Sequence, residues 1–235
     1  MTEPKIIFED DDILVLDKPP GLTVNRSDTA SDETTLQDFV SEKTSFSKND
    51  DEEFVNRGGI VHRLDKDTSG VILVAKNKEA FYGIQRQFKE RAVEKSYVCL
   101  VHGEVKPKDG VINAPVGRLP WNRKRFGVLA GGREAQSNYE TIKNLSLWGE
   151  KFSFLRVFPK TGRTHQIRVH MKYIGHPIFG DILYGGRKVS RSDRDKVNRL
   201  FLHAEKISFV HPVSKKRITF ESRLPVELEE IIHEI

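Results

Sequence analysis

The stretch His62-Arg-Leu-Asp-Lys-Asp-Thr-Ser-Gly70 gathers side chains that can do chemistry. It places Asp65 and Asp67 among basic and hydroxyl groups, directly before an aliphatic run at 71–75. An aspartate beside fixed cations stays ionised at neutral pH, and such a carboxylate can act as a nucleophile or base, for example at a sugar carbon. A surface turn in which Asp65 or Asp67 accepts backbone N–H groups would use the same residues. The nine residues alone leave both interpretations open.

Metal binding fits this sequence poorly. Asp65, Asp67 and Gly70 match the first half of a calcium loop, but the position that should hold a bidentate glutamate is Lys76, which would repel the ion. Three histidines, at 165, 170 and 176, lie close in sequence. Residues five apart on a helix are about 140° apart around its axis, so His165 and His170 do not face one zinc ion. We expect no metal site, and the chain has neither a glycine-rich phosphate loop nor a G-x-S-x-G elbow.

Charge is distributed unevenly along the 235 residues. Residues 1–60 contain 6 Lys/Arg against 15 Asp/Glu, whereas residues 61–235 contain 33 against 19. Basic clusters at 118–125, 187–199 and 215–217 are candidates for contacts with phosphates. A solvated charged surface is the alternative for any one cluster. We therefore expect a polyanion to bind the basic part of the chain.

The sequence also restricts the cellular setting. No apolar run approaches the roughly 20 residues that a membrane helix needs, and the N-terminus lacks the basic and apolar regions of a secretion signal. Cys99 is the only cysteine and cannot form an intramolecular disulfide. We expect a cytoplasmic protein that is not bound to a membrane.

The elements around the motif are predicted from apolar periodicity and turn residues. Segments 6–8 and 13–16 form a hairpin that Lys18-Pro-Pro-Gly21 ends, and helix 78–90 places Phe81, Ile84 and Phe88 on one face. We further expect strands at 71–75, 96–101, 139–142, 152–158, 206–210 and 217–220, a long basic loop or irregular hairpin at 115–132, and helices at 35–45, from an N-cap at Thr164 to Ile174, and from Pro225. Segment 46–57 is predicted to be a mobile loop. This is an α+β pattern with a mainly antiparallel sheet and flanking helices.

Several motifs together resemble one known family. Gly59-Ile-Val-His-Arg-Leu-Asp-Lys-Asp-Thr-Ser-Gly70 is similar to the signature of the RluA family of RNA pseudouridine synthases. The other family-like motifs, in chain order, are Leu16–Gly21, Lys95–Tyr97, Thr161–His170, Gly175–Asp181 and Leu202–Ala204. They cover about residues 6–220, and their order makes chance agreement improbable. The resemblance implies a single catalytic domain over 1–235 with a central basic cleft, and no N-terminal S4-type RNA-binding domain.

The resemblance also implies the chemistry. Such enzymes isomerise specific uridines in RNA to pseudouridine, which requires no cofactor. Asp65 corresponds to the catalytic carboxylate, which attacks C1′ or removes a 2′ proton. Tyr97 corresponds to the tyrosine that stacks under the uracil, and Arg168 is our candidate for the guanidinium that pairs with Asp65. Arg163 is the competing candidate and could instead bind phosphate near the helix N-terminus.

We expect the RNA to be bound by the catalytic domain itself. The candidate contacts are His62, Arg63, Arg163, Arg123, Lys124 and Arg125. The target nucleotide must leave its stack to reach a buried carboxylate. The substrate is either ribosomal or transfer RNA, and we expect a monomer without an obligatory protein partner. Two other functions remain open at this point: an RNA-binding module without catalysis, and a nucleoside N-glycosidase.

Overall fold

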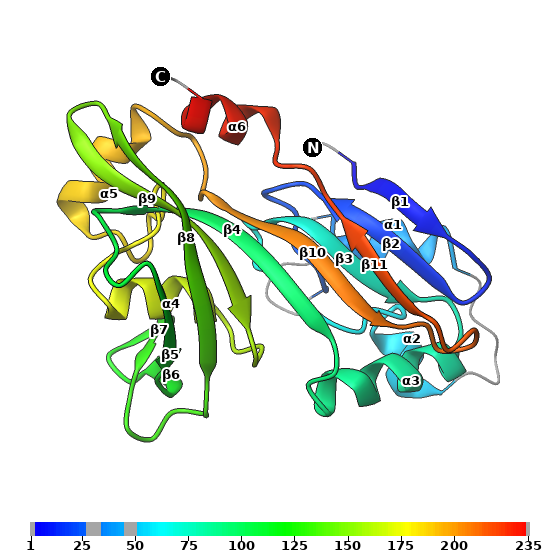
Figure 1. Ribbon diagram of the computed structural model, residues 1–235. Helices are drawn as coiled ribbons and strands as arrows, with labels where there is room; N and C mark the ends of the chain where they lie inside the picture. The colour runs from blue at the N-terminus through cyan, green and yellow to red at the C-terminus, as the bar shows by residue number, and fades with distance from the viewer. Residues whose placement is uncertain (1–2, 27–33, 45–50, 234–235) are drawn as a thin grey trace. The chain divides into compact units, whose positions relative to one another are not determined.

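The computed structural model describes residues 3–26, 34–44 and 51–233, which are divided between two compact units (Figure 1). Unit 1 contains residues 1–94 and 204–223, and unit 2 contains 95–203 and 224–235. Strands pair mainly antiparallel and helices accompany them, which confirms the predicted α+β class. No helix in the described ranges is both long enough and apolar enough to cross a bilayer. The assignment of 1–235 to one catalytic domain stays a prediction.

Unit 1 is built on strands that follow the order β1, β2, β3, β10, β11. Their bounds are β1 Lys5–Glu9, β2 Ile13–Lys18, β3 Ser69–Ala75, β10 Leu202–Val210 and β11 Arg217–Glu221. The predicted N-terminal hairpin is confirmed, since β1 pairs antiparallel with β2. Asp10 closes its turn, because Oδ1 accepts the N–H groups of Asp12 at 2.9 Å and Ile13 at 2.8 Å.

Strand β3 forms the centre of unit 1 and continues directly from the reactive stretch. All seven of its residues are buried. Gly70 has φ +113°, and a Cβ placed there would lie 2.2 Å from the carbonyl oxygen of Ala204 in β10. Only glycine therefore allows β3 and β10 to approach so closely at this position.

Helix α3, Lys78–Lys89, packs its apolar face against the same core, as predicted. Phe81 and Ile84 are fully buried beside Leu73, and Phe88 is partly buried at the end of the same face. Asn77 caps the helix by accepting the N–H of Ala80 at 2.9 Å. The helix thus rests on the strand that the reactive stretch enters.

Two short helices complete unit 1. Helix α1, Leu36–Ser41, begins with a capping box between Thr35 and Asp38. Helix α2, Glu52–Asn56, lies where a mobile loop was predicted, so that prediction is wrong for this part; residues 45–50 lie outside the described residues. Asp51 caps α2, and Phe54 is 1% exposed with its ring 5.5 Å from that of Phe81. One buried aromatic therefore anchors a helical turn in an otherwise charged segment.

Unit 2 contains an antiparallel sheet in the order β4, β9, β8, β5, and a separate hairpin of β6 and β7. The strand bounds are β4 Glu94–His102, β5 Asp109–Asn113, β6 Val116–Leu119, β7 Asn122–Val128, β8 Gln136–Leu147 and β9 Glu150–Pro159. The helices are α4 Gln166–Tyr173, α5 Arg187–Arg194 and α6 Val226–His233. The predicted irregular basic hairpin is the β6–β7 pair.

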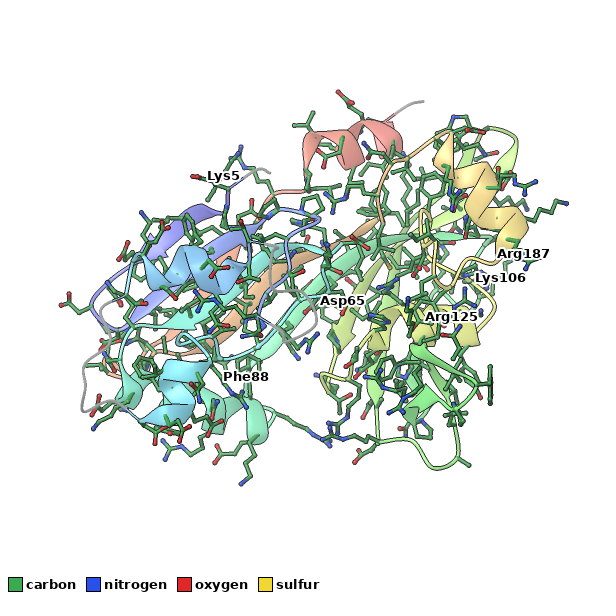
Figure 2. All side chains as sticks on the ribbon, turned by 180° about the vertical axis from the view of Figure 1, so that it is seen from behind. Lys5, Asp65, Phe88, Lys106, Arg125 and Arg187 are labelled. Atoms are coloured by element: carbon green, nitrogen blue, oxygen red, sulfur yellow. The ribbon has the colours of Figure 1, made fainter. Side chains whose placement is uncertain are left out.

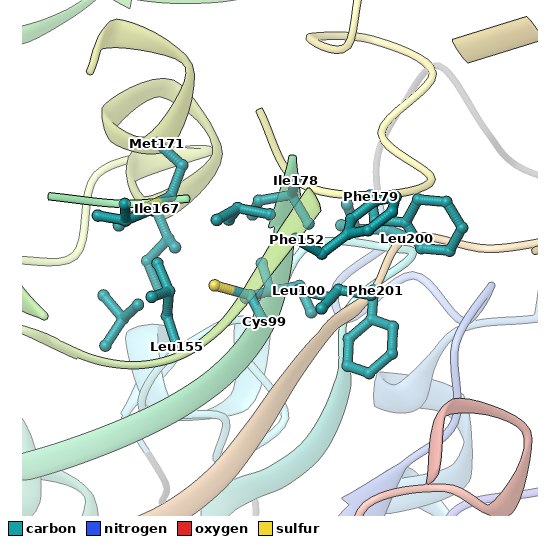
Figure 3. Packing of buried hydrophobic residues seen from close by; sticks show 14 of the residues in the cluster. Cys99, Leu100, Phe152, Leu155, Ile167, Met171, Ile178, Phe179, Leu200 and Phe201 are labelled. Carbon is teal, nitrogen blue, oxygen red and sulfur yellow. The ribbon is translucent and has the colours of Figure 1, made fainter. Parts of the chain in front are cut away.

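The core of unit 2 joins α4 to the sheet. Figure 3 shows Ile167 and Met171 of α4 pointing toward Leu155 of β9, near Cys99 of β4. Cys99, Leu155 and Met171 are fully buried. The predicted apolar face of this helix is confirmed, and it fixes how α4 lies on the sheet.

The start of α4 differs from the prediction. The helix begins at Gln166 and its N-cap is His165, with φ 55° and no side-chain cap, so Thr164 is not the N-cap. The Gln166 side chain instead reaches back before the helix, where Oε1 accepts the N–H of Arg163 at 3.0 Å and the hydroxyl of Thr161 at 2.6 Å. These bonds close the turn that precedes the helix.

Candidate active site

Asp65 begins a turn that leads into β3. The N–H of Thr68 donates to the carbonyl of Asp65 at 3.1 Å, and Ser69 begins the strand. Asp65 is half-buried, whereas Lys66 beside it is exposed. Figure 2 labels Asp65 among the side chains of unit 1. The carboxylate therefore sits on a short turn next to the most buried strand of the unit.

A buried lysine holds this turn. Lys18, the last residue of β2, is fully buried, and its ammonium donates to the carbonyls of Pro19 at 2.9 Å, Leu22 at 2.9 Å and Lys66 at 3.0 Å. The same Lys66 carbonyl accepts the N–H of Gly21 at 2.9 Å. Three carbonyl acceptors satisfy the three donors of an ammonium group. The turn after β2 and the turn that carries Asp65 are thereby joined at one cation.

His62 has a structural role in unit 1. Its Nε2 accepts the N–H of Leu73 at 2.9 Å, and its ring lies 5.0 Å from that of Phe88. A ring nitrogen that accepts an N–H carries no proton, so this contact uses the neutral imidazole. Arg63 is exposed. The predicted RNA contacts of His62 and Arg63 stay predictions.

Arg168 in unit 2 is buried and forms a two-bond pair with Asp181. Its Nε and Nη2 donate to the two carboxylate oxygens at 2.8 Å and 2.9 Å. Asp181 also accepts the N–H groups of Leu183 at 2.9 Å and Tyr184 at 3.0 Å. Two parallel charge-assisted bonds fix the plane of the guanidinium. The sequence motif Gly175–Asp181 marked this region, but nothing in its spacing identified Asp181 as the partner of Arg168.

Tyr184 connects this ion pair to the basic hairpin. Its ring lies 5.1 Å from the Arg168 guanidinium carbon. Its hydroxyl bonds to Nδ1 of His165 at 2.7 Å and accepts the N–H of Phe126 in β7 at 3.0 Å. Sequence reasoning missed Tyr184, because its contacts come from segments that are far apart in the chain.

The basic hairpin presents its polar side chains outward. Arg123 and Lys124 are exposed, Arg125 is half-buried, and Trp121 in the turn is 77% exposed. Phe126 packs beneath them against the cluster that contains Tyr184. The hairpin thus displays cations and an indole ring on a fixed base, which suits contacts with phosphates and bases.

The remaining predicted residues of unit 2 lie on β4 and before α4. Tyr97 is half-buried, pairs with Val157 of β9 and packs against the core of the unit. Arg163 is half-buried, and its Nε donates to the carbonyl of Glu134 at 2.9 Å. Burial lowers the pKa of Lys95, two residues before Tyr97, to about 8. A lysine with this pKa changes charge at mildly alkaline pH, and the sequence motif Lys95–Tyr97 contained it without assigning it a role.

The histidines named above serve as hydrogen-bonding groups. His170 bridges Oγ of Ser137 and the carbonyl of Ala114, each at 2.9 Å, and burial lowers its pKa. Nδ1 of His176 lies 2.8 Å from the carbonyl of His102. That the three histidines form no zinc site stays a prediction.

Among the described residues, Asp10, Asp12 and His211 have side chains close enough to hold a metal. His211 accepts the N–H groups of Val213 and Ser214 at Nδ1, which places its proton on Nε2. Nε2 then donates to Asp10 at 3.0 Å. In this arrangement Nε2 of His211 and the carboxylate of Asp10 form a hydrogen-bonded pair.

Comparisons with known proteins match this chain to RNA pseudouridine synthases. The sequence profile described as RNA pseudouridylate synthase matches residues 12–173. The chain is 40% identical to ribosomal large subunit pseudouridine synthase D of Nitrosomonas europaea, over 98% of this chain and 65% of that protein. It is 38% identical to the protein of the same name from Pseudomonas aeruginosa, over 95% of this chain and 69% of that one. The chain thus spans about two thirds of the length of these relatives.

A solved structure agrees with these sequence matches. The structure of human RNA pseudouridylate synthase domain containing 1 matches with a TM-score of 0.73 and 27% identity, covering 95% of this chain and 84% of that one. The likeness therefore extends over nearly all of the chain.

We predict that Asp181→Asn lowers the free energy of unfolding by about 3–5 kcal/mol, because it leaves the buried Arg168 charge opposite a neutral amide. Urea denaturation measures the change. Asp195→Asn, at an exposed aspartate in the same unit, is the matched control and should change stability by less than about 0.5 kcal/mol. Equal losses in both variants would contradict the structural role of the pair.

We also predict that the wild-type protein gains stability relative to Lys95→Met as the pH rises from about 8 toward the ordinary lysine pKa of 10.5. In that range the unfolded chain still holds the Lys95 proton and the folded chain has lost it, so the unfolded state binds more protons and stability rises with pH. Denaturation curves of both proteins at several pH values test this. A difference in stability that does not vary with pH would show that Lys95 titrates normally.

Proposed function

We propose that this chain, which belongs to the RNA pseudouridylate synthase family, isomerises uridines within RNA to pseudouridine. The proposal is carried mainly by Asp65, which lies within the residues that the family profile matches. Its turn is tied to the Lys18 ammonium through the Lys66 carbonyl. A carboxylate held in this way suits a step in which it must meet one carbon atom of a ribose.

The reaction exchanges one bond for another. The N1–C1′ bond of the uridine breaks, the uracil turns, and a bond forms between C5 and C1′. The proton on C5 is lost to solvent, and N1 gains a proton. No electrons are gained or lost overall, so the reaction needs neither a redox partner nor an external source of energy.

We assign three catalytic roles. Asp65 attacks C1′ or removes a 2′ proton, and both routes fit a carboxylate. Tyr97 stacks under the uracil and assists removal of the C5 proton. Arg168 is our candidate for the arginine that pairs with the catalytic carboxylate; its two bonds to Asp181 use Nε and Nη2, and a guanidinium has five donors, so it has donors left for a second carboxylate.

RNA contacts follow from the distribution of cations. Arg63, His62 and Arg163 would contact the RNA. The residues of the basic hairpin, Trp121 and Arg123 to Arg125, would bind phosphates and stack on bases. These contacts offset the few kcal/mol needed to extrude the target nucleotide from its stack.

We favour ribosomal RNA over transfer RNA as the substrate, because both relatives described above are named for the large ribosomal subunit. We further propose that the protein acts in the cytoplasm as a monomer. Mapping pseudouridines in total RNA from cells with and without the protein identifies the RNA.

The test of catalysis uses RNA carrying tritium at C5 of uridine. Asp65→Asn should reduce tritium release by about a thousandfold or more while RNA binding and the melting temperature stay close to wild type. Asp67→Asn, two residues away on the same turn, is the matched control and should retain release. Release that survives in Asp65→Asn, or free uracil and abasic RNA from the wild type, would contradict the proposal.

A further inference from the structure

A hollow of about 670 Å³ lies within unit 1 beside the Asp65 segment. Its lining includes Arg26, Arg57 and Arg63, together with Gln37, Val55 and His62. We call it the arginine pocket. Its volume is within the range of roughly 300–1,000 Å³ in which small ligands bind.

Three cations in this pocket contrast with the surrounding sequence. Residues 1–60 have more than twice as many Asp/Glu as Lys/Arg, 15 against 6, yet two of those six cations line the pocket. The third cation, Arg63, lies just beyond this acidic part, three residues after residue 60. Arginines gathered at one pocket within an acidic part of the chain favour an anionic ligand there, and two of them also pair with carboxylates, Arg26 with Asp38 and Arg57 with Glu53.

The walls of the pocket are fixed by hydrogen bonds. Arg26 donates through Nε to Asp38 at 2.6 Å, and Asp38 is itself held by the N–H and hydroxyl of Thr35, both at 2.7 Å. Gln37 is buried and connects two walls, accepting the N–H of Arg26 at 3.2 Å and donating to the carbonyl of Asn56 at 2.9 Å. The polar lining is thus arranged before any ligand arrives.

The remaining lining offers a surface for a base. Arg57 pairs with Glu53 at 3.1 Å on one edge of α2, and its side chain stays 50% exposed. Val55 on the same helix is an exposed apolar side chain. A phosphate fits the guanidinium groups, while an unstacked base fits an apolar contact or the flat face of an arginine.

We propose that the arginine pocket binds a nucleotide that flanks the target uridine, with its phosphate at Arg26 and Arg57. This inference rests on the proposed function. Arg63 lines the pocket and precedes Asp65 by only two residues, so their Cα atoms are at most about 7 Å apart. A strand whose uridine reaches Asp65 therefore lies close to Arg63, which lines the pocket.

The experiment measures binding of a fluorescent nine-nucleotide oligouridylate to the whole chain at several salt concentrations. Arg26→Gln and Arg57→Gln should each lower the slope of log affinity against log salt by about 0.7, and the double variant should bind about tenfold more weakly. Arg86→Gln removes an exposed charge from α3 in the same unit and should leave both values unchanged. Melting temperatures verify that the variants are folded.

Photocrosslinking adds a direct readout. Oligouridylate containing 4-thiouridine should crosslink to peptides of residues 51–63 in the wild type, and this crosslink should be lost in the double variant. Unchanged slopes, no crosslink in that range, or equal binding of uridine monophosphate and the oligomer would overturn the proposal. The two experiments distinguish failure of the pocket proposal from failure of the proposed function. If the wild type releases no tritium from RNA while the pocket variants still alter binding, the proposed function alone is contradicted.

Discussion

The buried ammonium of Lys18 is the constraint on which the candidate active site depends. A cation removed from water is costly unless its donors have acceptors, and here main-chain carbonyls from two different turns accept from the ammonium. One of these turns begins with Asp65. Neither turn can shift without leaving the ammonium short of a partner, so the carboxylate is positioned by main-chain geometry rather than by its own contacts alone. The fully buried β3 provides the rigid base for this arrangement.

The centre of unit 2 also holds a buried charge that several partners satisfy, but this charge is negative. Asp181 is buried and accepts from the Arg168 guanidinium and from two main-chain N–H groups. Tyr184 extends this network to the hairpin that carries Arg123 to Arg125. Apolar packing of α4 on the sheet supplies rigidity, while the buried ion pair determines where the arginine points. Helix α4 contributes to both the core of the sheet and the smaller cluster beneath the hairpin, so it supports the arginine of the pair and the cations of the hairpin.

The sequence predicted the elements whose structure depends on residues that are close together in the chain. The N-terminal hairpin, β3 and the apolar face of α3 follow from residue periodicity, and all are present. Helix α2 was missed because its stability comes from Phe54 in a tertiary contact and not from its charged neighbours. The cap of α4 was misplaced because Gln166 reaches back across the turn. Lys18 was interpreted as part of a turn, and Asp181 had no assigned role. The partners of these buried charges can be identified only in the folded chain.

The most direct test of this account is Lys18→Met, which fills the same space without the ammonium. We predict a loss of about 3 kcal/mol or more in the free energy of unfolding, because buried carbonyls lose their donors. Tritium release per bound RNA should fall as well, while RNA affinity is kept. Lys66→Met retains the Lys66 carbonyl and should retain stability. Wild-type stability and release in Lys18→Met would contradict the claim that this cation positions Asp65.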